Sequence, residues 1–450
     1  MLSRRGFLAS LLPPAKTPPP NLVIFLSDDH GLLDSSVYGA QDAPTPNMQR
    51  LAHQGMVFTH AFVASPSCAP SRAALLTGLY PARNGAEANH TKPRPEIRKL
   101  PSYLKELGYE TAAFGKVSHY RYTADYGFDT FGHDTIHDPQ AIPSALNFLA
   151  KRNSTKPLAL FVGSNWPHVP WPTEHPAYPN LTHPAKSVPT PETREARAQY
   201  LAAVANMDAE LGQVYDAARA RFGDNMVFLL TSDHGAQWPF GKWNLYDTGI
   251  RTPLIVAWPG VIRPHQRTAA MVQWIDLLPT LIDLAGGPPP QGLDGRSFAP
   301  VLRGSARQHR PEIFTTHSGD GDWNVFPIRA VRTPEWKYIR NLHPELQHST
   351  HTNRDSNKAA YRYWQSWERE AQTNPQARAL VEAFKRRPAE ELYDLRKDPD
   401  ERVNLAADPR HTRTLNRLRA RLDAWLKETN DSQKLFGKPL PRDAEALPLR

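Results

Sequence analysis

The chain has 450 residues with a hydrophobic content of 40%, and its formal net charge at pH 7 is +9. This length exceeds that of a typical single hydrophobic core, so we expect two domains, and the composition excludes a wholly disordered chain. The basic balance favours an anionic partner, which would be nucleic acid, a membrane surface or a polyanionic substrate. Because the sequence shows no helix-turn-helix spacing, zinc finger or RNA-recognition motif, we expect no nucleic acid partner.

The first residues, MLSRRGFLASLLPP, resemble a twin-arginine export signal, because Arg4 and Arg5 precede a short apolar run. The alternative is a frayed basic terminus, since the run is short and no cleavage site stands out. We expect residues 1–20 to be a signal and linker, and the protein to be exported to the periplasm or secreted. No segment is apolar enough to span a bilayer, so we expect no stable membrane insertion.

From residue 21 onward, apolar runs alternate with helical patterns. Strands are predicted at 21–27, 56–64, 109–114, 158–164, 226–232 and 254–258. Helices are predicted at 46–54, 70–77, 101–107, 192–222 and 275–285, where proline, glycine and capping residues mark the ends. This alternation predicts a doubly wound α/β fold with a mostly parallel sheet, and such sheets bind ligands beyond the carboxyl ends of their strands.

The pattern changes after about residue 310. A hairpin is predicted from the runs at 328–333 and 337–341, and helices are predicted at 359–369 and 412–427. We therefore expect a larger domain at residues 21–309 and a smaller C-terminal α+β subdomain at residues 310–450.

Cys68 is the only cysteine, so it cannot form a disulfide within the chain. A lone cysteine is often no more than a small buried hydrophobe. Here, however, Cys68 lies just before Pro70, which suits the first turn of a helix, and the free N–H groups at a helix start attract anions. Arg72 follows one turn later and can direct its guanidinium to the same point. The stretch therefore predicts an anion site.

The residues from Cys68 to Gly78, CAPSRAALLTG, resemble the sulfatase signature Cys-x-Pro-Ser-Arg with Thr-Gly shortly after it. The resemblance covers nearly the whole chain after residue 20, is strongest to heparan N-sulfatases and iduronate 2-sulfatases, and implies an alkaline-phosphatase-like fold. In that family a formylglycine-generating enzyme oxidises the cysteine to formylglycine, whose hydrate is the nucleophile. The resemblance implies this role for Cys68 and a sulfate-contacting role for Arg72.

Carboxylates stand at the ends of two predicted strands, at Asp28-Asp29 and at Asp233. Each aspartate alone would more often be a turn or capping residue, but three in one crevice would repel one another unless a cation joined them. Oxygen ligands suit calcium, whereas the imidazole of His234 leaves magnesium and manganese as alternatives. The resemblance implies one Ca²⁺ per chain, held by Asp28, Asp29, Asp233, His234 and the modified Cys68.

The resemblance also implies a pocket of basic side chains, because Lys116, His119, His168 and Lys242 follow the family's order. A lone lysine or histidine would usually be a solvated loop residue. We expect Lys116 and Lys242 to hold sulfate oxygens, and His168 to share the leaving-group side with Lys242. Asp233 is expected to help deprotonate the hydrate. His119 is expected to take the proton of the second hydroxyl, which expels sulfate.

These expectations describe a sulfatase that hydrolyses a sulfate ester or sulfamate, with the end of a sulfated glycan as the expected substrate. Trp166, Trp171, Trp238 and Trp243 are candidates for stacking on sugar rings or for buried packing. Two alternatives stay open. The chain could hydrolyse phosphate or phosphonate esters on the same fold, or it could bind sulfated glycans without catalysis if Cys68 is never modified.

Overall fold

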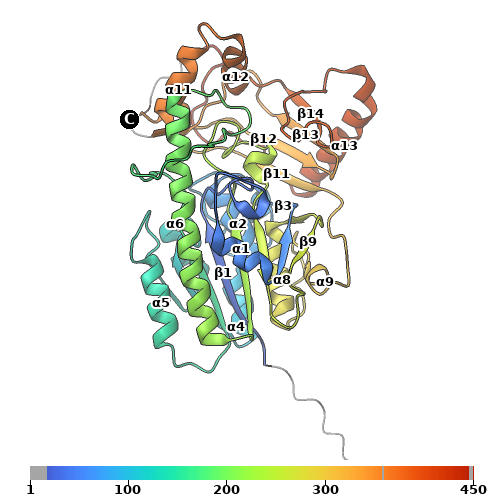
Figure 1. Ribbon diagram of the computed structural model, residues 1–450. Helices are drawn as coiled ribbons and strands as arrows, with labels where there is room; N and C mark the ends of the chain where they lie inside the picture. Colours follow the sequence, from blue (N-terminus) through green and yellow to red (C-terminus); the bar gives the residue numbers. More distant parts are fainter. Residues whose placement is uncertain (1–17, 357–358, 445–448, 450) are drawn as a thin grey trace, which may run out of the picture.

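The computed structural model describes residues 18–356, 359–444 and 449 (Figure 1). Its centre is an eight-stranded sheet in the order β5-β4-β6-β1-β7-β8-β2-β9. Neighbouring strands are parallel except at β8, which runs antiparallel to both β7 and β2. The bounds are β1 Asn21–Ser27, β2 Met56–Phe58, β4 Glu110–Gly115, β5 Thr130–Gly132, β6 Leu158–Gly163, β7 Met226–Ser232, β8 Leu254–Ala257 and β9 Gln266–Thr268. The predicted α/β fold with a mostly parallel sheet is confirmed.

Helices cover both faces of this sheet, which explains why every residue of β1 and β7 is buried. On one face lie α1 (Pro46–His53), α5 (Ala141–Lys151) and the long α6 (Pro191–Phe222). On the other face lie α2 (Cys68–Thr77), α4 (Leu100–Glu106) and α8 (Leu277–Leu284). The side chain of Thr190 caps α6 by accepting a hydrogen bond from the Thr193 N–H.

The C-terminal part contains a separate four-stranded antiparallel sheet in the order β11-β12-β13-β14 (Figure 1). Its strands are β11 Ile313–His317, β12 Ile328–Arg332, β13 Trp336–Asn341 and β14 Glu390–Asp394. The predicted hairpin is confirmed, because Arg332 pairs with Lys337 around the turn. The helices are α10 (His351–Arg354), α11 (Ala359–Glu370), α12 (Pro375–Lys385) and α13 (Thr412–Glu428). A domain boundary near residue 309 stays a prediction.

Three predicted elements differ in detail from the structure. The strand expected at 56–64 is broken, because β2 pairs within the large sheet whereas β3 (Ala61–Phe62) pairs with β10 (Val272–Gln273). The helix expected at 275–285 begins with a 3₁₀ turn at Trp274–Asp276 before α8. Cys68 does not precede α2 but is its first residue, after the N-cap Ser67.

Most of the predicted export signal falls on residues 1–17, which lie outside the described residues. Within the described part of the chain, no helix combines the length and apolar character needed to cross a bilayer.

Candidate active site

The candidate site lies at the carboxyl edge of the large sheet, where two neighbouring strands end together. β1 and β7 pair in register up to Ser27 and Ser232, so Asp28-Asp29 and Asp233-His234 follow side by side. The backbone N–H of Asp29 donates to Asp233 Oδ1 at 3.1 Å and ties the two strand ends together. The topology of the sheet therefore places these polar residues next to one another, as the sequence predicted.

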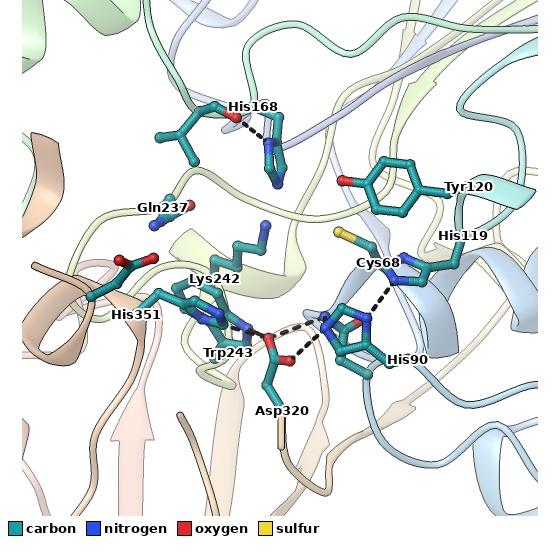
Figure 2. Close-up of a pocket in the computed structure, with 13 residues that line it drawn as sticks. Cys68, His90, His119, Tyr120, His168, Gln237, Lys242, Trp243, Asp320 and His351 are labelled. Carbon is teal, nitrogen blue, oxygen red and sulfur yellow. Dashed lines mark hydrogen bonds and ion pairs between the residues drawn. The ribbon is translucent and has the colours of Figure 1, made fainter. Parts of the chain in front are cut away.

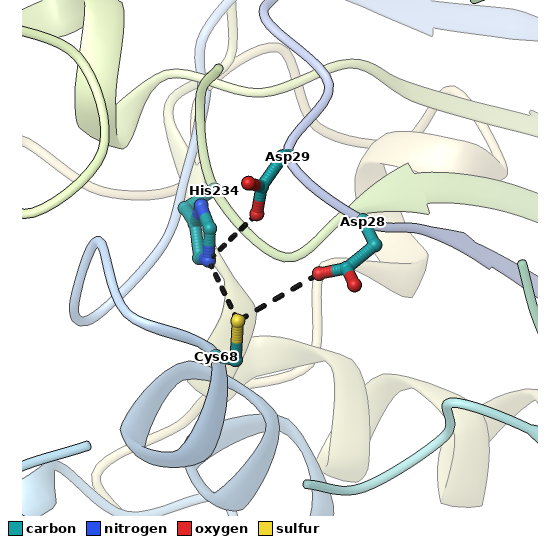
Figure 3. Close-up of side chains that lie close together, drawn as sticks. All are labelled: Asp28, Asp29, Cys68 and His234. Carbon is teal, nitrogen blue, oxygen red and sulfur yellow. Dashed lines mark hydrogen bonds and ion pairs between the residues drawn. The ribbon is translucent and has the colours of Figure 1, made fainter. Parts of the chain in front are cut away.

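Four side chains form a compact cluster that offers ligands to a metal ion (Figure 3). The ligand atoms of Asp28, Asp29, Cys68 and His234 all lie within 4.8 Å of one another. Cys68 Sγ is 3.7 Å from Asp28 Oδ1 and 3.3 Å from His234 Nε2. His234 Nδ1 is 3.0 Å from the Gly235 carbonyl, which fixes Nδ1 as the donor and leaves the Nε2 lone pair facing the cluster. Two carboxylates and an imidazole so arranged suit a divalent cation.

Asp233 lies beside this cluster and not within it. Its Oδ2 accepts a hydrogen bond from Arg72 Nε at 2.9 Å, and the same oxygen is 3.5 Å from His234 Nε2. Asp233 is therefore close enough to act with the cluster, although its strongest contact is to Arg72. Its predicted roles as metal ligand and proton acceptor remain predictions.

Three buried cations balance the carboxylates. Lys116 Nζ lies 2.5 Å from Asp28 Oδ2 and 3.4 Å from Cys68 Sγ. Lys242 Nζ lies 2.8 Å from Asp29 Oδ1, and Arg72 Nη2 lies 3.3 Å from Asp28 Oδ1.

Both the contacts with the cations and burial shift the pKa values of Asp28, Asp29 and Cys68. Burial would raise the pKa of Asp28, but Lys116, His168 and Arg72 together hold it well below its usual range. Burial raises the pKa of Asp29 despite Lys242, and it also raises the pKa of the Cys68 thiol. The site thus places three cations close to Cys68 and offsets them with three carboxylates, so their charges nearly cancel before any cation or anion binds.

A cavity of about 210 Å³ opens above Cys68 (Figure 2). His119, His168 and Lys242 line it, so the structure brings these predicted residues together with Cys68. Burial, followed by the charges of nearby lysines, lowers the pKa of both histidines well below the usual value, which keeps them neutral at neutral pH. A second cavity of about 370 Å³ shares His119 and also contains Tyr122.

We name two parts of this site. The floor consists of the buried residues Asp28, Asp29, Cys68, Arg72, Lys116 and His234. The rim consists of the cavity-lining residues His90, His119, Trp243, Asp320 and His351.

Sequence reasoning missed two of the five rim residues, Asp320 and His351. Asp320 lies three residues after β11, whose sequence IFTTH is only partly apolar, so the signal that marked Asp28 was much weaker there. Of the four tryptophans named as candidates for stacking on a sugar, Trp171 and Trp238 are buried and pack against each other with ring centroids 5.3 Å apart. Trp243 is also buried but lines the cavity, and its indole N–H donates to Asp320 Oδ2 at 2.8 Å.

Comparison with known proteins agrees with this geometry. Residues 20–287 match the family model described as Sulfatase, and residues 234–358 match that of the N-sulphoglucosamine sulphohydrolase C-terminal region. The chain is 31% identical over 439 residues to an ulvan-active sulfatase of Formosa agariphila, covering 94% of this chain and 83% of that protein. It is 28% identical to human N-sulphoglucosamine sulphohydrolase, covering 92% of this chain and 91% of that protein.

The fold is likewise shared with solved structures. The structure of a 2-O GAG sulfatase superimposes with a TM-score of 0.72 at 23% identity, covering 95% of this chain and 96% of that one. A protein solved in complex with its substrate D-glucosamine-2-N,6-O-disulfate superimposes with a TM-score of 0.68 at 18% identity, covering 95% of this chain and 100% of that one. The resemblance seen in the sequence is thereby confirmed: the chain belongs to the sulfatase family and is a hydrolase of sulfuric esters.

Proposed function

We propose that this sulfatase removes a sulfate group from a sulfated glycan, and that its nucleophile is a formylglycine made from Cys68. The observation that carries the proposal is the position of Cys68. It is the first residue of α2, it lines the cavity, and it lies among the cations and carboxylates of the floor. In the first turn of α2, the Ala69 N–H donates to Asn89 Oδ1, Pro70 has no N–H, and the Ser71 N–H donates to the Ser67 carbonyl, so the nearby cations and not free helix N–H groups would attract the anion.

We further propose that Asp28, Asp29, His234 and the modified Cys68 hold one Ca²⁺, with Asp233 alongside. Two carboxylates supply the hard oxygen ligands that calcium prefers, and the imidazole leaves Mg²⁺ and Mn²⁺ as the alternatives to be tested. A bound cation would lower the pKa of the nucleophilic hydroxyl and neutralise charge on the sulfate.

The remaining residues of the floor and cavity would bind the sulfate and move protons. Arg72, Lys116 and Lys242 would hold sulfate oxygens, which gain negative charge as the reaction proceeds. Asp233 would accept the proton of the attacking hydroxyl, and His119 would accept the proton of the second hydroxyl when sulfate leaves.

Lys242 would be the charged donor on the leaving-group side. His168 Nδ1 is 2.6 Å from the Val169 carbonyl and donates to it, so its Nε2 remains to relay a proton from Lys242.

The proposed substrate is the sulfated end of a glycosaminoglycan or related polysaccharide, with heparan-type chains ahead of others. Relatives named for ulvan, N-sulphoglucosamine and hexuronate 2-O-sulfate support this class. The net charge of +9 would draw a polyanionic chain toward the site. We also propose that the protein is exported through the signal at residues 1–20 and that a formylglycine-generating enzyme modifies Cys68.

The test uses protein coexpressed with a formylglycine-generating enzyme. Sulfate release is measured from heparan disaccharides, chondroitin disaccharides and an aryl sulfate. Hydrolysis of a phosphate ester and of a phosphonate ester is measured in parallel, because these are the substrates of the alternative enzyme class. We expect turnover of a sulfated disaccharide above that of the aryl sulfate. Preferred release of phosphate, or binding of the disaccharide without turnover by fully converted protein, would contradict the proposal.

The metal is tested on the same protein. Chelation should abolish sulfate release, and Ca²⁺ should restore it better than Mg²⁺ or Mn²⁺. Full activity after exhaustive chelation, or best recovery with another ion, would reject the calcium assignment.

A further inference from the structure

Three rim side chains, those of His119, His90 and Asp320, contact one another in this order along the wall of the cavity (Figure 2). His119 Nε2 is 2.8 Å from His90 Nδ1. His90 Nε2 is in turn 3.1 Å from Asp320 Oδ1. The three residues come from separate parts of the sequence: the loops after α3 (Pro81–Asn84), after β4 and after β11. Nothing in the roles described above uses His90 or Asp320.

Asp320 is held firmly in one orientation. It is only 1% exposed, and its Oδ2 accepts hydrogen bonds from Trp243 Nε1 at 2.8 Å and from Asn89 Nδ2 at 3.1 Å. His351 Nδ1 lies 3.7 Å from the same oxygen. Burial would raise the pKa of Asp320, but its contacts with His90, His351 and Trp243 outweigh burial and hold that pKa well below the usual range. Asp320 is therefore an ionised carboxylate, which can only accept hydrogen bonds.

This carboxylate determines where the protons sit on both histidines. The His90 nitrogen that faces Asp320 must carry a proton, so in neutral His90 Nε2 is the donor and Nδ1 is an acceptor. Since His90 Nδ1 accepts, the partner nitrogen His119 Nε2 must donate. Neutral His119 then has no proton on Nδ1. The Asn89 amide has a second hydrogen that could point to His90 Nε2 at 3.5 Å, but the Asp320 Oδ1 oxygen is closer, at 3.1 Å, and carries negative charge, so the carboxylate decides the tautomer.

The unprotonated nitrogen of His119 is the one available for chemistry. His119 Nδ1 is buried and has no hydrogen-bond partner among the residues that the structure describes. His119 lines the same cavity as Cys68. In the middle of the chain of contacts, the His90 side chain is 57% exposed and can exchange protons with water.

We propose that Asp320 and His90 are positioning residues that hold His119 in the tautomer whose Nδ1 accepts a proton in the cavity, and that they pass that proton to solvent. This inference rests on the role proposed for His119. In the step, the hydroxyl proton is transferred to His119 Nδ1 while the Nε2 proton moves to His90 Nδ1. His90 then releases its Nε2 proton to water, so no net charge accumulates beside Cys68. After sulfate has left, His90 Nε2 takes up a proton from water, the Nδ1 proton of His90 returns to His119 Nε2, and His119 Nδ1 loses its proton to water in the cavity, which restores the tautomers that Asp320 favours.

The backbone supports a dedicated position for His90. Its φ is 61°, a left-handed conformation that non-glycine residues adopt at a cost, and such strain is concentrated at functional sites. The Tyr122 hydroxyl donates to the His90 carbonyl at 2.9 Å and helps to hold this conformation.

The decisive variant is Asp320→Asn. An asparagine can turn its NH₂ group toward His90 Nε2, which would make that nitrogen an acceptor, make Nδ1 a donor and leave the proton of His119 on Nδ1. We expect kcat to fall by about 10²- to 10⁴-fold with KM nearly unchanged, as expected for a general base held in the wrong tautomer. A rise in KM with unchanged kcat would show that Asp320 binds the sugar and would overturn the proposal.

A second readout does not depend on turnover. Nitrogen-15 NMR of the histidine rings in the Cys68→Ala protein should show His119 protonated on Nε2, and Asp320→Asn should move that proton to Nδ1. The His119 signals are assigned among the 18 histidines by difference with His119→Gln. An unchanged tautomer in Asp320→Asn would overturn the inference. Absence of sulfate release by the native protein would instead reject the proposed function, and the NMR result would still decide the tautomer.

Two further variants guard against misfolding and general effects. Because the His90 side chain is exposed, added imidazole should reach its place in His90→Ala and raise the kcat of that variant at least about tenfold. No increase would count against the proton path. The matched control is Glu345→Gln, which removes the carboxylate 2.7 Å from His343 Nδ1 in an exposed pair outside the cavity. It should leave kcat, KM and the His119 signals unchanged.

Discussion

The floor and the rim of the site are built in different ways. The floor comes from the ends of β1, β4 and β7 and the first two turns of α2, and these three parallel strands necessarily end at the same edge of the sheet. The rim combines His90 and His119 from loops of the sheet region with Asp320 and His351 from the C-terminal part. The floor therefore follows from one sheet, whereas the rim exists only where two parts of the chain meet.

This difference indicates that the floor and the rim have different roles. Floor residues are buried and tied to one another by ion pairs, so a change there disturbs both charge balance and chemistry. Rim residues vary from buried Asp320 to exposed His90, so changes there can alter proton movement or substrate fit while the floor stays intact. The following predictions test this separation.

The largest effect is expected at the floor for Cys68→Ala. Removing the sulfur removes the precursor of the nucleophile, so we expect sulfate release to fall by at least about 10⁴-fold. Steady-state assays on a sulfated disaccharide measure this. The variant should fold normally, since Cys68 is small and α2 already contains alanines. Activity within tenfold of the native protein would contradict the nucleophile assignment.

Arg72→Ala should have the largest effect on stability. The Arg72 guanidinium lies 3.3 Å from Asp28 Oδ1 and 2.9 Å from Asp233 Oδ2, and the variant removes it while both carboxylates stay buried. Breaking such a buried ion pair costs about 3–5 kcal/mol of unfolding free energy. Urea unfolding measures the loss. The matched control is Arg402→Ala, whose ion pair with Asp400 is exposed and should be worth less than about 1 kcal/mol. Equal losses in both variants would contradict a charge-coupled floor.

His317, behind the rim at the end of β11, should make stability depend on pH. Burial lowers its pKa from 6.5 to about 4, so the unfolded chain takes up a proton first as the solution is acidified. Its contribution to stability is complete above about pH 6.5 and is lost by about 3 kcal/mol toward pH 4.

The measurement compares unfolding free energies of the native protein and His317→Gln at pH 7 and pH 4.5. Other buried histidines also lower stability in acid, so the difference between the two proteins isolates His317. We expect a smaller loss in the variant. An equal loss of unfolding free energy in both proteins between pH 7 and pH 4.5 would show that His317 does not change its protonation on unfolding.

Tyr122→Ala tests the second cavity, next to the rim, and should have the smallest effect. Tyr122 lines the second cavity, where an aromatic ring can pack on a sugar beyond the sulfated one. Loss of about 1 kcal/mol would raise KM for a disaccharide about fivefold with little change for an aryl sulfate. A matching rise in KM for both substrates would argue against a second sugar contact.

The comparison of floor and rim also explains what could be predicted from the sequence. The apolar runs of β1 and β7 end in Asp28-Asp29 and Asp233-His234, so local pattern and sheet topology suffice to bring them together. The signature around Cys68 supplied Cys68 and Arg72, and the resemblance to the sulfatase order of basic residues supplied Lys116.

The rim depends on packing between distant segments, which a local pattern does not contain. Asn89 and Asp320 are 231 residues apart in the sequence, and contacts over such separations leave no periodic signal. The short β3 and β5 also lack the length of a typical strand. For the same reason the break between β2 and β3 was not predicted, because it is decided by the partner strand β10.

The central claim is that formylglycine at residue 68 is the nucleophile of a glycan sulfatase. The most direct measurement varies the degree of Cys68 conversion by varying coexpression of the formylglycine-generating enzyme. Mass spectrometry of the Cys68 peptide gives the converted fraction, and sulfate release from a heparan disaccharide is measured on the same samples. We predict activity proportional to the converted fraction, with none at zero conversion. Equal activity in converted and unconverted samples would contradict the claim.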